Sequence, residues 1–337
     1  MNGSGRSQAI APKRSLVTGG TGFIGSHLIE ALLGRGHHVR CLIRSTSPQK
    51  WIEGLNVEIA HGDCTEISSL RTALDGIDTV YHVAGVNRSV DPATFFRVNG
   101  LGTENLVRVC LEKKDPPRFV YVSSQAAAGP CMGDGLSVEA DQCRPVSVYG
   151  RSKRKGEEAV LEVGDRLRGV ILRPCAVYGP RDRDFLTIFR TISHGIQIGL
   201  WGLEPRISLC YVIDLVSAIV MAGEKELPSG ETFFISDGRI YTLQDVEMAI
   251  ARVLGVRPIP IRVPVSLLRV AAEFADRTSK KSGKPGIFGR DKYREMIQPN
   301  WCCDSTKATS ELEFSPCFDL HKGVAATVSW YRKEGWL

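Results

Sequence analysis

Short apolar runs alternate with amphipathic stretches through the first half of the chain. The apolar runs predict buried strands, and stretches with apolar residues three or four positions apart predict helices. The predicted strands span residues 15–18, 39–43, 57–60, 79–83, 118–122 and 169–172, and the predicted helices span residues 23–33, 67–74, 94–112 and 147–163. This alternation predicts an α/β protein whose parallel sheet carries helices on both faces, with every strand ending at one edge.

The pattern changes after Pro174. Residues 176–208 read as irregular, and residues 238–337 hold helices separated by Pro and Gly clusters. Between them, residues 209–212 and 232–235 predict strands that return to the sheet. We therefore expect a doubly wound Rossmann fold with a smaller, discontinuous C-terminal cap. The predicted division is a flexible N-terminus at 1–12, a Rossmann domain at 13–175 plus about 208–237, and a substrate-binding cap at 176–207 and 238–337.

Composition narrows the class of protein. Of the 337 residues, 43% are hydrophobic and 24% charged, as in ordinary globular chains. The net charge of +6 reads as diffuse, which favours a small anionic ligand and argues against nucleic acid. No apolar stretch approaches the length of a membrane span, so we expect a cytoplasmic protein with no membrane partner. The ten cysteines lack zinc-site spacing, so we expect reduced thiols and no metal.

The first strand runs directly into a glycine-rich turn. Gly19, Gly22 and Gly25 recur every three positions, and each is expected to have its own structural role. Gly19 permits a tight turn, Gly22 lets the backbone approach a pyrophosphate, and Gly25 lets the helix pack against the strand. The first helical residues, Phe23 and Ile24, then offer backbone N–H groups to the phosphates. This turn predicts a dinucleotide site.

Cofactor specificity is predicted from the ends of the second and third strands. Arg44 stands where an NAD-binding chain commonly has an acid, and its guanidinium favours the 2′-phosphate of NADP. Arginine also stacks on adenine, so NAD stays open. Asp63 is a candidate acceptor for the adenine amino group, or alternatively the N-cap of a helix starting near Glu66.

A second group of residues points to proton transfer. Tyr149 and Lys153 lie four positions apart on a predicted helix, which places them on one face. The ammonium, together with the positive ring of an oxidised nicotinamide, is expected to lower the pKa of the phenol and make it an acid/base. Ser123 and Ser124 follow a predicted strand at the carboxyl edge of the sheet, which is the edge where ligands bind in such folds. A hydroxyl at this edge could polarise a substrate oxygen. The plainer interpretations are an exposed helical pair and a serine turn or cap.

Six motifs in register carry a family resemblance. They are TGGTGFIG at 18–25, YHVAG at 81–85, VNGLGT at 98–103, SS at 123–124, YGRSK at 149–153 and RPCAVYGP at 173–180. The chain resembles an extended short-chain dehydrogenase/reductase of the NAD-dependent epimerase/dehydratase group, over roughly residues 13–238.

The resemblance implies roles for individual residues. Ser124, five positions before Gly129, would form the catalytic triad with Tyr149 and Lys153, with Ser123 as the fallback hydroxyl. Further residues at or near the cofactor would be Ala84, Gly85, Asn99 and Pro174. A buried Asn satisfying helix backbone is the alternative for Asn99. Asp214 resembles a structural acid that would cap a helix, and the family implies a homodimer through the helices of Asn99 and Tyr149.

Departures from the family pattern select among reactions. A dehydratase would carry Asp-Glu where this chain has Gln125 and Ala126. Many nucleotide-sugar epimerases would carry Arg where this chain has Ile207, although Arg206 is adjacent and a bulge would rescue it. These departures favour a reductase or dehydrogenase acting at a secondary alcohol or ketone carbon. An epimerase is the alternative, and a non-catalytic NADP-binding protein the third hypothesis.

The substrate is expected between the ligand edge and the cap, lined by residues 86–91, 129–135 and 181–206. Arg181, Arg183 and Arg206 are candidates for an anionic or nucleotide-linked small molecule, with pairing to Asp182 and Asp184 as the plainer interpretation. Trp201 would stack on a ring or pack inside the cap.

Overall fold

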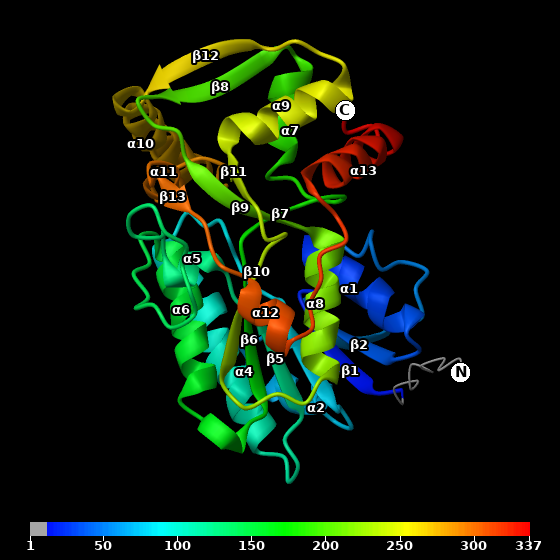
Figure 1. The fold of residues 1–337 in the computed structure, drawn as a ribbon. Coiled ribbons are helices and arrows are strands. Elements are labelled where there is room, and N and C mark those ends of the chain that lie inside the picture. Colours follow the sequence, from blue (N-terminus) through cyan, green and yellow to red (C-terminus); the bar gives the residue numbers. More distant parts are fainter. Residues whose placement is uncertain (1–11) are drawn as a thin grey trace, which may run out of the picture.

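A computed structural model describes residues 12–337 of the chain. The predicted flexible N-terminus at 1–12 lies outside this range except for Pro12. Seven parallel strands form the central sheet, in the order β10-β6-β5-β4-β1-β2-β3. Their bounds in that order are Glu231–Ile235, Gly169–Pro174, Arg118–Val122, Thr79–His82, Arg14–Thr18, His38–Ile43 and Glu58–His61. The predicted parallel Rossmann sheet is therefore confirmed (Figure 1).

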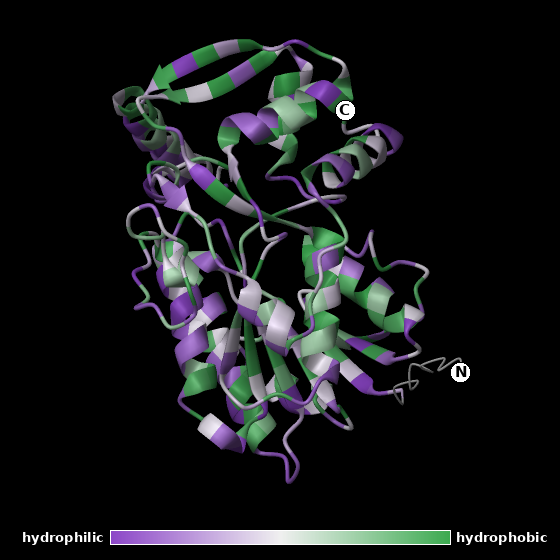
Figure 2. Ribbon diagram, viewed as in Figure 1, coloured by the Kyte–Doolittle hydropathy of each residue, from purple (hydrophilic) through white to green (hydrophobic). Residues whose placement is uncertain are grey.

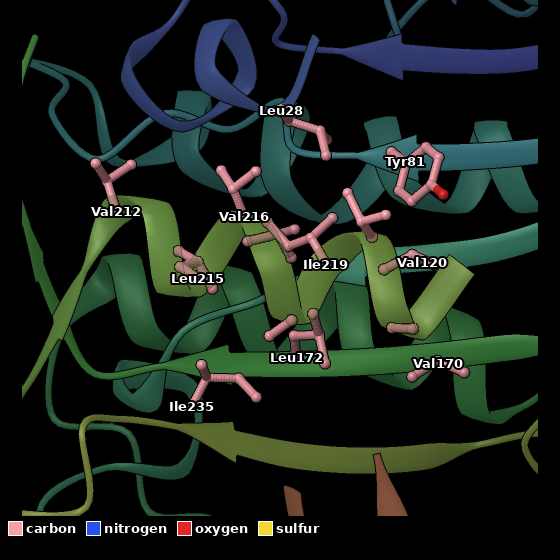
Figure 3. Packing of buried hydrophobic residues seen from close by; sticks show 14 of the residues in the cluster. Leu28, Tyr81, Val120, Val170, Leu172, Val212, Leu215, Val216, Ile219 and Ile235 are labelled. Atoms are coloured by element: carbon pink, nitrogen blue, oxygen red, sulfur yellow. The ribbon is translucent and has the colours of Figure 1, made fainter. Parts of the chain in front are cut away.

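Two helical layers cover this sheet. One face carries α1 (Phe23–Gly34), α8 (Val212–Glu224) and α12 (Thr306–Glu311). Leu172, Val216 and Ile219 are among the buried side chains between α8 and the strands (Figure 3). The opposite face carries α2 (Ile67–Ala73), α4 (Gly102–Leu111) and α6 (Val148–Leu161). Because apolar side chains are buried on both sheet faces, the strands read as continuous apolar runs.

The helix predicted at 94–112 is interrupted. It divides into α3 (Pro92–Phe95), the π-helical segment η1 (Phe96–Leu101) and α4. Such π segments are uncommon and frequently lie at functional sites. Two short elements complete this part of the chain, α5 (Gln125–Ala128) and the 3-10 turn η2 (Gly164–Arg166).

The cap is more regular than the sequence pattern predicts. The prediction that residues 176–208 are irregular is wrong, because they contain β7 (Ala176–Tyr178), α7 (Leu186–Ser193) and β8 (Ile196–Trp201). The buried residues of α7, Leu186, Phe189 and Ile192, recur every three positions, which is a helical signal. The remaining cap elements are β11 (Ile240–Thr242), α9 (Leu243–Leu254), β12 (Ile259–Pro264), α10 (Val265–Ser282), α11 (Arg290–Met296), β13 (Asn300–Trp301) and α13 (Leu320–Lys333).

One predicted strand pairs elsewhere. The prediction for 232–235 is confirmed by β10, but β9 (Arg206–Tyr211) does not return to the central sheet. It pairs instead with β7, β11 and β13 in a second sheet. An apolar run is buried equally well in either sheet, so periodicity alone does not identify its partners. The domain boundaries given above stay a prediction.

Candidate active site

The glycine turn has the backbone geometry that its sequence predicts. Gly19 has φ +72°, a left-handed conformation that favours glycine. A Cβ on Gly25 would lie 2.2 Å from the Gly19 carbonyl oxygen, so α1 packs against the turn only because residue 25 lacks a side chain. No side chain caps α1, whose N-cap is Gly22. The turn therefore leaves this helix start open to a phosphate, and it fits a dinucleotide.

A buried histidine braces the same turn. His82 ends β4, and its ring nitrogens lie 2.7 Å from Thr18 Oγ1 and 2.9 Å from Thr103 Oγ1. Thr18 Oγ1 also accepts a hydrogen bond from the Ala84 N–H at 3.1 Å. Burial lowers the pKa of His82 to about 3, so the ring is neutral. No local sequence pattern indicates a role for His82, because its partners lie 64 and 21 positions away.

Asn99 holds the loop after β4 against the helix of Tyr149. Its Oδ1 accepts from the Val86 N–H at 2.8 Å, and its Nδ2 donates to the Val86 carbonyl at 2.9 Å and to Ser152 Oγ at 2.9 Å. Asn99 is fully buried within η1. The side chain thus satisfies loop backbone and links that loop to α6. It is a positioning residue for the strand edge.

The two serines after β5 are not equivalent. Ser123 Oγ donates to the buried carboxylate of Glu157 at 2.6 Å, and Arg173 donates to both oxygens of the same carboxylate at 2.9 and 2.7 Å. This engagement argues against Ser123 as the fallback hydroxyl. Ser124 is half-buried at the N-cap of α5 and accepts from the Ala126 N–H at 3.1 Å. Sequence analysis missed Glu157.

Tyr149 lies in the first turn of α6. Burial raises the pKa of its phenol to about 12, although a hydrogen bond with the Ser124 side chain lowers that pKa in part. In the protein without cofactor, burial therefore outweighs the favourable contact with Ser124. The Phe95 ring lies 6.5 Å from the Tyr149 ring, edge to face. A phenol with this pKa holds its proton at neutral pH.

Lys153 points from α6 toward the end of β5. Its Nζ donates to the Val122 carbonyl at 2.7 Å and lies 4.5 Å from the centre of the Tyr121 ring. Burial lowers the pKa of Lys153 to about 7, while the charge of Glu157 opposes that shift. A Cβ on Gly85 would lie 3.6 Å from this Nζ, so the lysine adjoins the loop predicted to line the cofactor.

The other predicted cofactor residues lie at the strand ends. Arg44 is exposed directly after β2, and Pro174 is the buried last residue of β6. Asp63 follows β3, where its Oδ1 accepts from the Thr65 N–H and Oγ1, both at 2.8 Å. Asp63 does not cap α2, whose N-cap is Glu66 without a side-chain bond.

The predicted substrate-lining segments meet one another. Asn87 Nδ2 donates to Asp184 at 3.0 Å and Arg88 pairs with the same carboxylate, which joins 86–91 to 181–206. Residues 129–135 contact β13, since Asn300 Nδ2 donates to the Gly133 and Gly135 carbonyls. Arg206 also donates to the Asp134 carbonyl, so the three segments are linked through hydrogen bonds.

The three candidate arginines are largely engaged with protein. Arg181 pairs with Glu30 of α1 at 2.6 Å, a different partner from the predicted Asp182 or Asp184. Arg183 lies 5.2 Å from the Trp336 ring. Arg206 donates to the Asp134 carbonyl at 3.3 Å, and β9 pairs regularly with β11 from 206 to 208, which gives no bulge to redirect it.

Two further expectations are corrected. Trp201 is 69% exposed, so it does not pack inside the cap. Asp214 is structural as expected but is not an N-cap, because α8 begins at Val212 with Tyr211 as its cap. Its carboxylate instead accepts from the Cys317 and Phe318 N–H groups at 2.9 and 3.0 Å. Asp214 therefore ties α8 to the segment before α13.

A carboxylate from the C-terminal cap binds free N–H groups at the N-terminus of α6. Asp291 on α11 accepts from the Val148 N–H at 2.6 Å and from the Tyr149 N–H at 3.1 Å. Ser147 accepts from the Gly150 N–H at 2.9 Å, so two residues satisfy this helix terminus. Glu295, also on α11, contributes to the raised pKa of Tyr149. Sequence analysis missed Asp291, which lies about 140 positions from its partners.

The parallel sheet and the glycine turn after β1 define a Rossmann-type α/β protein, and comparison with known proteins identifies its family. The model of the NAD dependent epimerase/dehydratase family matches residues 15–236, and the chain belongs to that family. It is thus an enzyme of the extended short-chain dehydrogenase/reductase type, as predicted. Among the residues that the structure describes, no helix has the length and apolar character needed to cross a bilayer.

Curated relatives and solved structures cover almost the whole chain. A ceramide reductase of Caulobacter vibrioides is 29% identical over 327 residues, covering 95% of both chains. A 3-beta-hydroxysteroid dehydrogenase of Mycolicibacterium neoaurum is 27% identical, covering 94% of this chain and 91% of the relative. The structure of Thermus thermophilus UDP-glucose 4-epimerase with NAD superposes with TM-score 0.76 at 24% identity, covering 95% and 99%.

Proposed function

We propose that the protein is an NAD(P)-dependent reductase or dehydrogenase that transfers hydride at a secondary alcohol or ketone carbon. The observation that carries this proposal is the placement of Tyr149 one helical turn before Lys153 on α6, with the Lys153 ammonium at the end of β5. Lys153 in turn adjoins Gly85, one residue past Ala84, where the β4 loop meets the glycine turn. A proton donor and a dinucleotide site therefore share one strand edge.

Tyr149, Ser124 and Lys153 would each have a different role in proton transfer to the substrate oxygen. Tyr149 holds its proton at neutral pH, so it suits the role of general acid toward a carbonyl oxygen. Ser124 would hydrogen-bond the same oxygen and hold it in place. Lys153 would bind ribose hydroxyls and, when protonated, stabilise the phenolate that Tyr149 leaves behind. When bound, the nicotinamide supplies the hydride.

The cofactor would lie with its pyrophosphate on the turn of Gly19, Gly22 and Gly25 and its adenosine near Arg44 and Asp63. We propose NADP as the preferred form, because Arg44 is exposed at the end of β2 and no acid stands in that position. NAD stays the alternative, since the solved epimerase relative binds NAD.

Arg44 provides a direct test of this preference. Replacing Arg44→Glu removes the cation and adds a charge that repels a 2′-phosphate, so NADPH should bind about ten- to a hundredfold more weakly. NADH affinity should hold or improve, and both are measurable by calorimetry without any substrate. Equal loss of both cofactors, or an unchanged NADPH affinity, would refute the role of Arg44.

The substrate class is proposed to be an apolar, lipid-like alcohol or ketone. The names of the two curated relatives specify a ceramide and a 3-beta-hydroxysteroid, both largely apolar molecules. The engagement of Arg181 and Arg206 with protein also disfavours an anionic substrate. A homodimer and a cytoplasmic location stay predictions.

The activity test pairs cofactor release with substrate trials. Purified protein is denatured and any released nucleotide identified, and fresh protein is then supplied with NADPH and either a long-chain aliphatic ketone or a 3-ketosteroid. A reductase releases little nucleotide and oxidises NADPH with at least one ketone. Tightly retained NAD with interconversion of UDP-sugars would replace this proposal with the epimerase alternative.

A further inference from the structure

The amphipathic helix α10 exposes most of its large apolar residues. Its only buried residue is Ala272. Leu267, Val270 and Phe274 are 57%, 63% and 66% exposed, and their spacing of three and four places them on one helical face. Arg277 and Lys281 continue that face toward the C-terminal end of the helix. The face is thus apolar at its start and cationic at its end.

The strands that precede α10 extend the exposed apolar surface at this end of the molecule. In the register of β8 with β12, Ile196 pairs with Ile259 and Ile198 with Ile261, so the four side chains share one sheet face. All four are exposed, between 37% and 70%. Figure 1 places both strands and α10 at the upper end of the cap, and Figure 2 shows hydrophobic segments along the two strands.

The positive charge of the protein is concentrated in the same segment. Residues 257–295 hold ten Lys and Arg against four Asp and Glu, an excess of +6 that equals the net charge of the whole chain. The expectation that this charge is diffuse is therefore wrong. The acids of α10 are already engaged, since Arg269 pairs with Glu273 at 3.5 Å and Arg290 with Asp276 at 2.7 Å.

Four cations at the end of α10 remain available. Within residues 12–337, no carboxylate lies within ion-pairing distance of Arg277, Lys280, Lys281 or Lys284. Lys280, Lys281 and Lys284 are exposed. Flexible cations that flank an exposed apolar stripe on an amphipathic helix are typical of helices that lie in a membrane interface.

We propose that the exposed face of α10, together with Lys280, Lys281 and Lys284, docks on the surface of an anionic lipid bilayer. A second copy of the chain is disfavoured, because a twofold contact would set this cationic segment against itself. Nucleic acid would satisfy the charge but would leave Leu267, Val270 and Phe274 exposed. A bilayer with anionic headgroups accommodates both the cations and the apolar side chains.

This proposal revises the expectation of no membrane partner, which rested on the lack of a spanning segment. Docking needs no spanning helix, since an amphipathic helix lies in the plane of the interface. The helix α10 is also linked to the catalytic candidates, because α11 packs on α10 and its Asp291 accepts from the Tyr149 N–H. A lipid-like substrate would therefore be reached from the bilayer.

The test is sedimentation of the full-length protein with vesicles, without substrate, so that its outcome is independent of the proposed activity. One set of vesicles is phosphatidylcholine alone, and in the other about a third of the lipid is phosphatidylglycerol. The protein should pellet with the anionic vesicles, bind phosphatidylcholine at least about tenfold more weakly, and be released by high salt.

Three variants assign the binding to this face. L267S/V270S/F274S removes the apolar stripe and K280E/K281E/K284E reverses the cations, and each should weaken binding about tenfold or more. The matched control I59S/I213S/M248S changes three exposed apolar residues on β3, α8 and α9 and should bind like the wild type. Thermal melts and size-exclusion profiles accompany every variant.

Several results would overturn the proposal. They are a wild-type protein that pellets with neither vesicle, a serine variant that binds as well as the wild type, and binding of RNA in place of vesicles. A wild-type dimer that the serine variant converts to monomer, without vesicle binding, would assign the face to contact between copies. If the serine variant fails to fold, the exposed lysine variant still decides.

Discussion

At the scale of single residues, the dinucleotide turn depends on close contacts between backbone atoms. Gly19 and Gly25 meet at a distance that only residues without side chains allow, since a Cβ on Gly25 would lie 2.2 Å from the Gly19 oxygen. A Cβ on Gly19 would in turn lie 2.7 Å from the Ala84 nitrogen. The glycine turn and the β4 loop are therefore fitted to each other before any ligand binds.

The close approach at Gly25 predicts a large effect from one methyl group. Gly25→Ala should lower the free energy of unfolding by about 1–3 kcal/mol and weaken NADPH binding, because the Gly19 carbonyl has to move. The control is Gly34→Ala in the same helix, where a Cβ meets nothing within 4 Å. Chemical denaturation and calorimetry check both variants, and equal effects of the two would contradict this reading of the turn.

His82 predicts a pH dependence of stability. Its pKa is about 3 in the folded chain and about 6.5 when unfolded, so acid protonates the unfolded chain first. The contribution of the neutral ring is complete above about pH 6.5 and decreases by up to about 1.4 kcal/mol per unit toward pH 3. Unfolding measured at several pH values should show a smaller acid loss in His82→Gln than in the wild type.

The matched control makes the same change at the exposed His194, away from the buried network of His82. If His82→Gln and the wild type lost stability in parallel on acidification, another group would be responsible.

At the scale of elements, the helix that carries Tyr149 is held from outside the Rossmann sheet. The N-terminus of α6 receives Asp291 from α11, and α11 packs on α10. The carboxylate meets free N–H groups and the positive end of the helix dipole, an arrangement that stabilises a helix start. The cap therefore contacts the backbone of Tyr149 directly.

Removal of the Asp291 carboxylate should lower both stability and activity, and a control variant separates the two effects. Asp291→Ala should cost about 1–2 kcal/mol of unfolding free energy and also reduce kcat, because the first turn of α6 carries Tyr149. The matched control is Asp319→Ala, which removes the N-cap of α13, where Asp319 accepts from the Lys322 N–H at 2.9 Å. D319A should lose similar stability with kcat unchanged. A normal kcat in D291A would contradict the positioning role.

Local patterns account for what the sequence predicts well. The strands from 14 to 174, the helix of Tyr149 and Lys153 and the glycine turn all follow from periodicity or short spacing. Glu157 and Asp291 were missed because Ser123 and the Val148 N–H group, which they bind, lie 34 or more positions away, where no local pattern exists. The predicted pairing of β9 was wrong for the same reason, because an apolar run does not specify which strand it pairs with.

At the scale of the whole molecule, chemistry and surface charge occupy different elements. The strand edge brings together Ser124, Tyr149 and Lys153 with the dinucleotide turn, while residues 257–295 carry the entire net charge. The helix pair α10–α11 joins the two regions, with one helix exposed and the other in contact with α6. If both proposals hold, mutation should separate binding to a bilayer from turnover at the strand edge.

The central claim is that the Tyr149 phenol is the acid/base beside a nicotinamide cofactor. Its most direct test compares Tyr149→Phe with the wild type, using the ketone that the wild-type enzyme reduces fastest. Single-turnover hydride transfer from saturating NADPH should fall about a hundredfold to ten thousandfold, and the Kd for NADPH should stay within a few-fold of wild type. An unchanged rate of hydride transfer in Tyr149→Phe would contradict the account.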